Sequence, residues 1–112
     1  MPANYIPARG DFVWLQFSHQ AGHEQAGHRP AFVISPEAYN RKTGLALVCP
    51  LTTQVKGYPF EVVVPPGQKA KGVILSDQIK NLDWKARNAT LLGRADAALT
   101  TEVLAKAMTL LS

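Results

Sequence analysis

The chain has 112 residues, 46% of them hydrophobic and 18% charged, a size and composition that predict one domain over residues 1–112. Twelve Lys and Arg against eight Asp and Glu give a formal net charge of +4, which permits an acidic partner such as nucleic acid or an acidic peptide. No apolar run approaches the ~18 residues of a membrane span and no secretory pattern opens the chain, so we expect a cytoplasmic protein with no membrane contact. The one cysteine, Cys49, lies in an apolar run, which favours a buried thiol over a reactive one.

Short apolar runs separated by turn residues predict a β-rich fold. In chain order we expect strands at residues 11–17, 31–34, 45–49, 60–64, 72–75 and 90–94, a polar loop at 18–28, a turn at 39–44 and a helical turn within 77–84. Together these short strands and tight turns indicate a small, strongly bent sheet or barrel.

The last part of the chain has the pattern of an amphipathic helix. Thr100 is the expected N-cap, and Glu102 falls in the first turn. Apolar residues then share one face at helical spacing: Val103, Leu104, Ala107, Leu110 and Leu111. We expect this helix to pack on the sheet.

Chemistry-bearing side chains gather in the polar loop. Glu24, Gln25, His28 and Arg29 lie close together there, between two glycines and a proline. RNA cleavage without a metal needs a base for the 2′-hydroxyl, an acid for the leaving 5′-oxygen and fixed donors for the phosphorane oxygens. A carboxylate, an imidazole and a guanidinium can fill these roles. The structural alternative is an ion pair between Glu24 and Arg29, with the histidines solvated.

Two other kinds of site fit this loop less well. His19, His23 and His28 could ligate zinc, but Gly22 and Gly27 disfavour a shared helix face, and no further Cys or His lies nearby as a fourth ligand. A phosphate-binding P-loop needs a lysine after its glycines, which this loop lacks. We therefore expect neither a metal nor a cofactor.

A second polar group, Thr52-Thr53-Gln54, follows the strand predicted at 45–49. Hydroxyls and an amide at a strand end are typical of a turn cap, and they could equally donate to a phosphate. Aromatic residues at strand spacing belong mostly to the core. An exposed ring near Lys56, such as Tyr58, could stack on a base of single-stranded nucleic acid.

Taken in order, several segments resemble the MazF/PemK family of toxin–antitoxin ribonucleases. The likeness runs from about residue 5 to residue 112 and is carried by Gly10-Asp11-Phe12-Val13-Trp14, Glu24-Gln25-Ala26-Gly27-His28-Arg29-Pro30, Ser35-Pro36, Tyr39-Asn40, Lys42-Thr43-Gly44, Pro50, Thr52-Thr53-Gln54, Lys56-Gly57-Tyr58-Pro59-Phe60-Glu61-Val62-Val63, Asp77-Gln78-Ile79-Lys80 and Trp84-Lys85-Ala86-Arg87. The E-Q-x-G-x-R-P and K-G-Y-P-F-E-V segments are specific as a pair, and the likeness is strongest to the MazF branch.

The resemblance implies a fold and an activity. The fold is α+β, mainly β: a small SH3-like barrel of the CcdB/MazF/PemK type with a C-terminal amphipathic helix, working as a homodimer. The activity is sequence-specific, metal-independent cleavage of single-stranded RNA, including mRNA, to 2′,3′-cyclic phosphate and 5′-hydroxyl ends. This cleavage would inhibit translation and growth, and an acidic MazE-like antitoxin would neutralise it.

The resemblance also assigns site residues. The family's catalytic arginine and threonine match Arg29 and Thr52, and Glu24 matches a loop glutamate important for activity. Because arginine stays protonated near pH 7, Glu24 is the preferred base, with Arg29 neutralising the scissile phosphate and Thr52 donating to a non-bridging oxygen. Another branch uses an Arg-x-Asp pair at the positions of Leu75 and Asp77, and here only the aspartate is present. RNA-binding roles are assigned to Gln25, His28, Asn40, Thr53, Gln54, Lys56, Tyr58, Asp77 and Lys80.

Two other functions fit the same fold. A related toxin family with this barrel binds DNA gyrase and cuts nothing, and a plain RNA- or peptide-binding barrel would keep the basic turns without a catalytic group. The grouping of Glu24 with Arg29, together with Thr52, favours the nuclease. RNA cleavage separates it from both alternatives.

Overall fold

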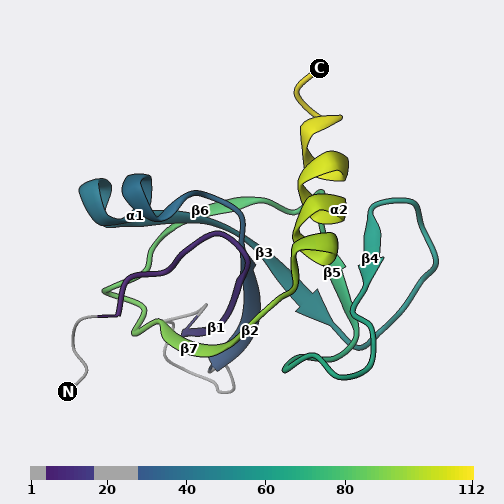
Figure 1. Ribbon diagram of the computed structural model, residues 1–112, viewed down its shortest axis with the longest axis horizontal. Helices are drawn as coiled ribbons and strands as arrows, with labels where there is room; N and C mark the ends of the chain where they lie inside the picture. The colour runs from purple at the N-terminus through teal and green to yellow at the C-terminus, as the bar shows by residue number, and fades with distance from the viewer. Residues whose placement is uncertain (1–4, 17–27) are drawn as a thin grey trace, which may run out of the picture.

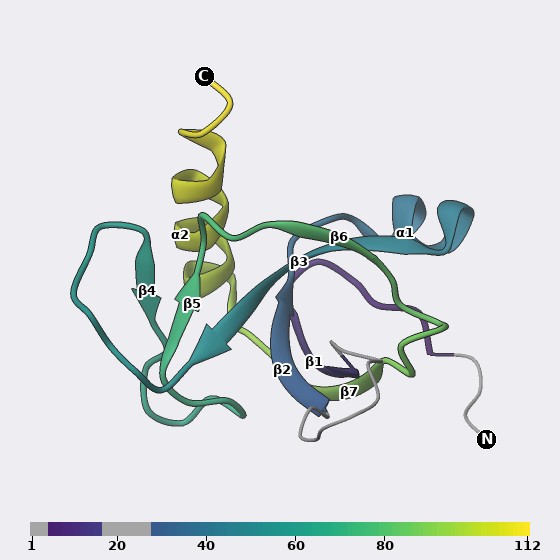
Figure 2. The same cartoon turned by 180° about the vertical axis from the view of Figure 1, so that it is seen from behind.

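The computed structural model describes residues 5–16 and 28–112. In these residues, the elements follow in the order β1 (Asp11–Gln16), β2 (His28–Val33), α1 (Glu37–Thr43), β3 (Leu45–Thr52), β4 (Glu61–Val63), β5 (Val73–Leu75), β6 (Lys80–Asp83), β7 (Thr90–Arg94) and α2 (Ala97–Met108). In Figures 1 and 2, β1, β2, β6 and β7 curl together in one part of the molecule, and β4 and β5 form another part, with α2 between them.

All strand pairs in the sheet are antiparallel, in the order β4-β5-β3-β2-β1-β7, and β6 pairs with β3 off this path. The long strand β3 joins the two parts. Leu45–Val48 pair with β6, the middle of β3 pairs with β2, and Leu51 and Thr52 pair with β5. The expected barrel-like fold with a C-terminal helix is therefore confirmed.

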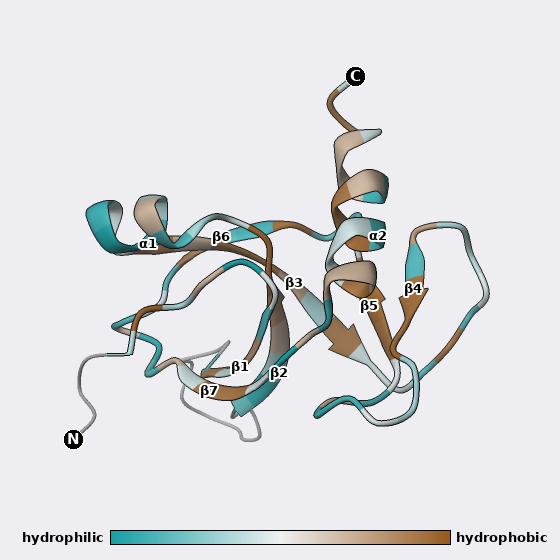
Figure 3. Ribbon diagram, in the orientation of Figure 1, coloured by the Kyte–Doolittle hydropathy of each residue, from teal (hydrophilic) through white to brown (hydrophobic). Residues whose placement is uncertain are grey.

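The core forms two clusters because strand alternation sends side chains to both faces of the bent sheet. On one face, Phe12 and Phe32 stand directly opposite each other, edge to face at 5.3 Å, and pack in one cluster with Leu99 and Val103 of α2. A second cluster consists of Val13, Leu15, Ala31, Val33, Ala46, Val48 and Trp84. Figure 3 shows hydrophobic residues along β3, β5 and α2, and hydrophilic ones at the start of β2.

Cys49 belongs to the first cluster and is fully buried, as expected. Burial, with a smaller contribution from the charge of Asp77, raises the pKa of its thiol to about 12. A thiol in this state is a core residue rather than a nucleophile.

The expected C-terminal helix is present, but its predicted start is wrong. Asp96 is the N-cap, with its carboxylate accepting from the Leu99 amide at 2.9 Å, and Thr100 lies one turn inside the helix. An aspartate at the N-cap satisfies a free amide and also faces the positive end of the helix dipole. Val103 and Ala107 are buried as expected, whereas Leu110 and Leu111 lie beyond the helix and are 45% and 79% exposed.

Two further predictions of local structure are wrong. Residues 37–43 form helix α1, which ends at Gly44 with a φ of 75°, where we expected only a turn. Residues 80–83 form strand β6 instead of a helical turn, because they pair with Leu45–Val48 of β3. Both elements have weak local patterns, and long-range packing decides their conformation.

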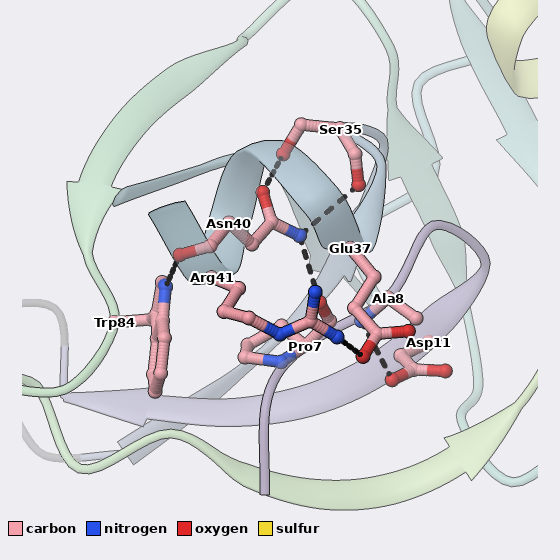
Figure 4. A network of polar contacts seen from close by, with 8 residues as sticks. All are labelled: Pro7, Ala8, Asp11, Ser35, Glu37, Asn40, Arg41 and Trp84. Carbon is pink, nitrogen blue, oxygen red and sulfur yellow. Dashed lines mark hydrogen bonds and ion pairs between the residues drawn. The ribbon is translucent and has the colours of Figure 1, made fainter. Parts of the chain in front are cut away.

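A buried polar network ties α1 to the N-terminal segment and to the turn after β6 (Figure 4). The Asn40 side-chain amide donates to the Pro7 and Ser35 carbonyls at 2.8 and 3.1 Å and accepts from the Ser35 hydroxyl at 2.5 Å. The Trp84 indole donates to the Asn40 carbonyl at 3.0 Å. Asn40 is 0% exposed, so every bond it makes is shielded from water.

Asp11 is a second buried polar residue near the N-terminus. Its carboxylate accepts from the Tyr5 hydroxyl at 2.5 Å and from the Ala8 amide at 3.0 Å, and it pairs with Arg94 at 3.3 Å. Burial, followed by this bond to Asp11, raises the pKa of Tyr5 above its ordinary range. Among the residues described, neither helix has the length and apolar character needed to cross a lipid bilayer.

Candidate active site

A pocket of about 530 Å³ opens where β3 ends. Its wall is formed by residues of β2, β3, β4, β5 and β6, and of the turns that join β3 to β4 and β5 to β6. The lining consists of Arg29, Pro50, Leu51, Thr52, Gln54, Lys56, Tyr58, Glu61, Leu75, Gln78 and Lys80. Six of these were predicted site residues: Arg29, Thr52, Gln54, Lys56, Tyr58 and Lys80.

Strand register brings Arg29 and Thr52 to the same pocket although 23 positions separate them in the chain. Ala31 of β2 pairs with Pro50 of β3 in an antiparallel ladder. Arg29 lies two residues before Ala31 and Thr52 two residues after Pro50, so both residues lie just beyond the same end of this antiparallel ladder. The guanidinium and the hydroxyl therefore come from neighbouring strands of one rigid sheet.

Thr52 is held through both its side chain and its backbone. Its hydroxyl oxygen accepts from the Gln54 amide at 3.1 Å, and the residue pairs with Val73 of β5. A hydroxyl that accepts in this way keeps its proton for donation. Gly72, with a φ of 98°, lies so close that a Cβ there would stand 2.2 Å from the Thr52 carbonyl oxygen.

The turn between β3 and β4 presents Lys56 and Tyr58 to the pocket. The Glu61 carboxylate accepts from the Gly57 amide at 2.8 Å and from the Lys56 amide at 3.0 and 3.2 Å. The Tyr58 hydroxyl donates to Asp77 at 2.7 Å. This hydrogen bond is the main reason that the pKa of Tyr58 is raised.

Cationic side chains dominate the pocket wall. Arg29, Lys56 and Lys80 face it, whereas among the described lining residues Glu61 is the one carboxylate, and its oxygens already accept from backbone amides. Such a wall fits a phosphate group, which Arg binds bidentately and Lys as a point charge. Over residues 5–16 and 28–112, no group of three or more His, Cys, Asp or Glu side chains is arranged to hold a metal ion.

The structure does not bring all predicted site residues together. Glu24 and Gln25 lie outside the described residues. His28 lines a separate, open pocket with Trp14, Asn88 and Thr90, although it is adjacent to Arg29 in the chain. Thr53 is exposed beside the main pocket, and Asp77 is exposed and reaches the pocket through Tyr58.

Asn40, for which an RNA-binding role is predicted, lies in the protein interior and outside the pocket lining. Its side chain is 0% exposed, and all of its described hydrogen bonds are to the protein interior. Contact with RNA would require that network to open and leave buried polar groups without partners. Asn40 is a structural residue.

Several residues that line or support the pocket were not predicted from the sequence. Glu61 lines the pocket and holds the Lys56 turn, and Gly72 lies against the Thr52 carbonyl, outside the lining. Glu61 lies inside the K-G-Y-P-F-E-V segment, so a signal for it was present. Pro50 and Gln78 belong to segments that carry the resemblance, and Leu75 takes the position at which another branch has an arginine. Leu51 has no such signal, and the pairing of β3 with β5 places it in the wall.

The sequence matches a known protein family and several of its members. Residues 8–111 match the family model described as PemK-like, MazF-like toxin of type II toxin–antitoxin system. The chain is 55% identical over 93 residues to the endoribonuclease toxin MazF of Escherichia coli (strain K12), covering 83% of each chain. It is 34% identical over 108 residues to the endoribonuclease PemK of Escherichia coli, covering 93% of this chain and 81% of PemK.

Solved structures of MazF proteins are also similar to this chain. The crystal structure of MazF from Deinococcus radiodurans has a TM-score of 0.86 and 50% identity, and the match covers 96% of this chain and 98% of that one. A MazE–MazF structure from the same organism also gives 0.86, at 44% identity, with 97% and 98% covered. Both the sequence and the fold are therefore similar to these toxins over nearly the whole chain.

Proposed function

The chain belongs to the PemK-like, MazF-like toxin family of type II toxin–antitoxin systems, and from this membership we propose that it is an endoribonuclease toxin. Relatives named endoribonuclease cover most of the chain at 55% and 34% identity. The observation that carries the proposal is the meeting of Arg29 and Thr52 in one cationic pocket at the end of β3. Neither the gyrase poison nor the inert binding barrel gains support from these relatives.

The proposed reaction is attack of a ribose 2′-hydroxyl on its own 3′-phosphate. Glu24 takes the 2′-hydroxyl proton, and the new O–P bond closes a 2′,3′-cyclic phosphate. The bond from phosphorus to the 5′-oxygen of the next nucleotide breaks, and that oxygen takes a proton from water to become a hydroxyl. Arg29 neutralises the charge that develops on the phosphorane, and Thr52 donates to a non-bridging oxygen. No step needs a metal ion or a cofactor.

Other pocket residues are proposed to bind the RNA strand. Lys56 and Lys80 attract its phosphates, Gln54 and Thr53 donate hydrogen bonds, and the Tyr58 ring can stack on a base. Gln25, His28 and Asp77 remain candidates for contacts with flanking nucleotides. Because single-stranded bases are read by stacking and edge hydrogen bonds, this wall suits unpaired RNA, including mRNA.

We also propose the chain's partners. MazF of Deinococcus radiodurans is found in complex with MazE, and a net charge of +4 suits an acidic MazE-like antitoxin. The working form is proposed to be a homodimer of the single domain over residues 1–112. An mRNA substrate places the protein in the cytoplasm.

The decisive experiment incubates the purified protein with a long, defined RNA in excess EDTA and maps every new end. We expect cuts at one short sequence, with 5′-hydroxyl and 2′,3′-cyclic phosphate ends, and no cuts by Arg29→Ala. Arg41→Ala is the matched control, because Arg41 is exposed and pairs with Glu37 on α1, away from the pocket lining. Failure of the folded, antitoxin-free protein to cut several unstructured RNAs would overturn the proposal.

A further inference from the structure

The pocket contains one feature that simple electrostatics does not explain, a carboxylate within a wall proposed to bind phosphates. Glu61 lies at the start of β4 and lines the pocket together with Arg29, Lys56 and Lys80. A free carboxylate there would repel the RNA backbone. We propose that Glu61 is a positioning residue, which holds the turn that presents Lys56 and Tyr58 to RNA. This inference rests on the proposed function of the pocket.

The contacts of Glu61 are those of an internal anion site. Both of its oxygens accept from the Lys56 amide, at 3.0 and 3.2 Å, and one also accepts from the Gly57 amide at 2.8 Å. Gly57 has a φ of 82°, a conformation that a side chain disfavours and that lets successive amides converge on one acceptor. The carboxylate therefore occupies a backbone concavity of the kind that binds anions.

The turn needs such an anchor because it has no regular structure of its own. Residues 54–58 form neither helix nor strand. Further along, the Glu61 amide donates to the Tyr58 carbonyl at 3.0 Å, and the Lys106 ammonium of α2 donates to the Pro59 carbonyl at 2.7 Å. These bonds hold the end of the turn near β4, and Glu61 holds the part that carries Lys56.

The amides also change what the RNA encounters. Two N–H dipoles pointing at the carboxylate offset part of its charge, so the wall as a whole remains cationic. The backbone that carries the Lys56 ammonium and the Tyr58 ring is therefore already fixed before RNA binds. A turn without this anchor has to be ordered when RNA binds, and that ordering weakens binding.

Glu61→Gln is a sharp test, because a positioning role predicts weaker RNA binding by this variant and charge repulsion predicts tighter binding. Binding of an uncleavable RNA, with a 2′-deoxy or 2′-O-methyl group at the scissile position, is measured over a range of salt concentrations. We expect about 5- to 10-fold weaker binding, because a neutral amide oxygen is a weaker acceptor than the carboxylate for the Lys56 and Gly57 amides. The slope of log K against log salt should fall by up to about 0.7, the value for one lost phosphate contact to a single strand.

Glu102→Gln is the matched control. It removes the same charge from an exposed position of α2 that does not line the pocket. Its RNA binding should match that of the parent or tighten slightly. Lys56→Ala completes a double-mutant cycle with Glu61→Gln. If Glu61 acts through Lys56, the loss on removing Lys56 is smaller in the Glu61→Gln background than in the parent.

Tighter RNA binding by Glu61→Gln would overturn the proposal and show that the carboxylate repels the backbone. A second measurement on the RNA-free protein separates this proposal from the proposed function. Amide protons of Lys56 and Gly57 should move upfield in the NMR spectrum of Glu61→Gln and exchange faster with solvent. Unchanged amides in the folded variant contradict the positioning role, whatever the protein does to RNA. If the Lys56 and Gly57 amides change in Glu61→Gln but the parent protein does not bind RNA, the role of Glu61 in the turn is supported and the proposed function is rejected.

Discussion

Two regions of this molecule are rich in polar side chains, and they differ in what those side chains bind. Around Asn40, each side-chain amide and hydroxyl bonds to another part of the protein and is shielded from water. At the end of β3, Arg29, Lys56 and Lys80 line an open pocket. In the first region polar chemistry holds the fold together, and in the second it is available for a ligand.

The comparison teaches that the same kinds of residue serve both purposes. Asn40 and Thr52 both stand in segments that resemble the family, so both are candidates for RNA binding or catalysis on sequence grounds. Burial separates them: Asn40 is 0% exposed, and Thr52 is partly exposed at a pocket. If this distinction is correct, substitutions in the two regions affect different quantities.

The largest effect is expected from the two residues proposed to act on the phosphate. Arg29→Ala and Thr52→Ala should each lower the RNA cleavage rate by on the order of 10²–10³, the usual cost of losing one fixed donor to developing charge. Their free energies of unfolding, measured in urea, should stay close to that of the parent, and both should remain dimeric. Near-normal cleavage by either variant would remove that residue from the mechanism.

The second-largest loss of cleavage rate is expected when the backbone beside Thr52 is displaced. Gly72→Ala places a Cβ against the Thr52 carbonyl oxygen, where the 2.2 Å distance forces the strand end to shift. Misplacing a catalytic group by about 1 Å can cost about 10² in rate, so we expect a loss of that order in single-turnover cleavage.

Gly67→Ala is the matched control for this strain. Gly67 has a similar φ of 94°, but a Cβ there would meet nothing within 4 Å. Both variants should lose about 1 kcal/mol of stability from the positive φ alone. Equal cleavage rates for the two variants would show that the close approach of Gly72 does not position Thr52.

In the region around Asn40 we expect an intermediate effect, which lowers the free energy of unfolding and leaves cleavage unchanged. Asn40→Ala removes the bonds that the Asn40 amide makes to the Pro7 and Ser35 carbonyls and to the Ser35 hydroxyl, which should cost about 2–3 kcal/mol of unfolding free energy. Cleavage per folded molecule should not change. Asn81→Ala is the control, since the exposed Asn81 side-chain amide donates to the Tyr39 hydroxyl at 3.1 Å. A cleavage defect of folded Asn40→Ala would erase the distinction between the regions.

The smallest effect concerns the titration of Tyr58. Its hydrogen bond to the Asp77 carboxylate stabilises the protonated phenol and raises the pKa. The favourable contact is thus present below the ordinary tyrosine pKa and is lost as pH rises through the raised value. Asp77→Asn should lower the Tyr58 pKa, as followed by NMR of the labelled phenol carbon, and Asp83→Asn should not. An unchanged Tyr58 pKa in Asp77→Asn would mean that the pair does not form in solution.

Much of the fold followed from local pattern. Strands at 11–17, 45–49 and 90–94 correspond to β1, the first part of β3 and β7, because alternation and turn residues define them locally. Strand β6 was missed because its four residues carry little local preference and gain their structure from pairing with β3. The helix cap was misplaced because Asp96 and Thr100 are both good caps, and the packing of Leu99 in the core decides between them.

The sequence by itself determined the composition of this site: an arginine, a threonine, lysines and a tyrosine in segments that also resemble one family. The tertiary structure decided which of them meet. Register between β2 and β3 brings Arg29 to Thr52, and the close approach of Gly72 fixes the strand end. The same structure removed Asn40 from the site, because burial depends on what packs around a residue and not on its neighbours in the chain.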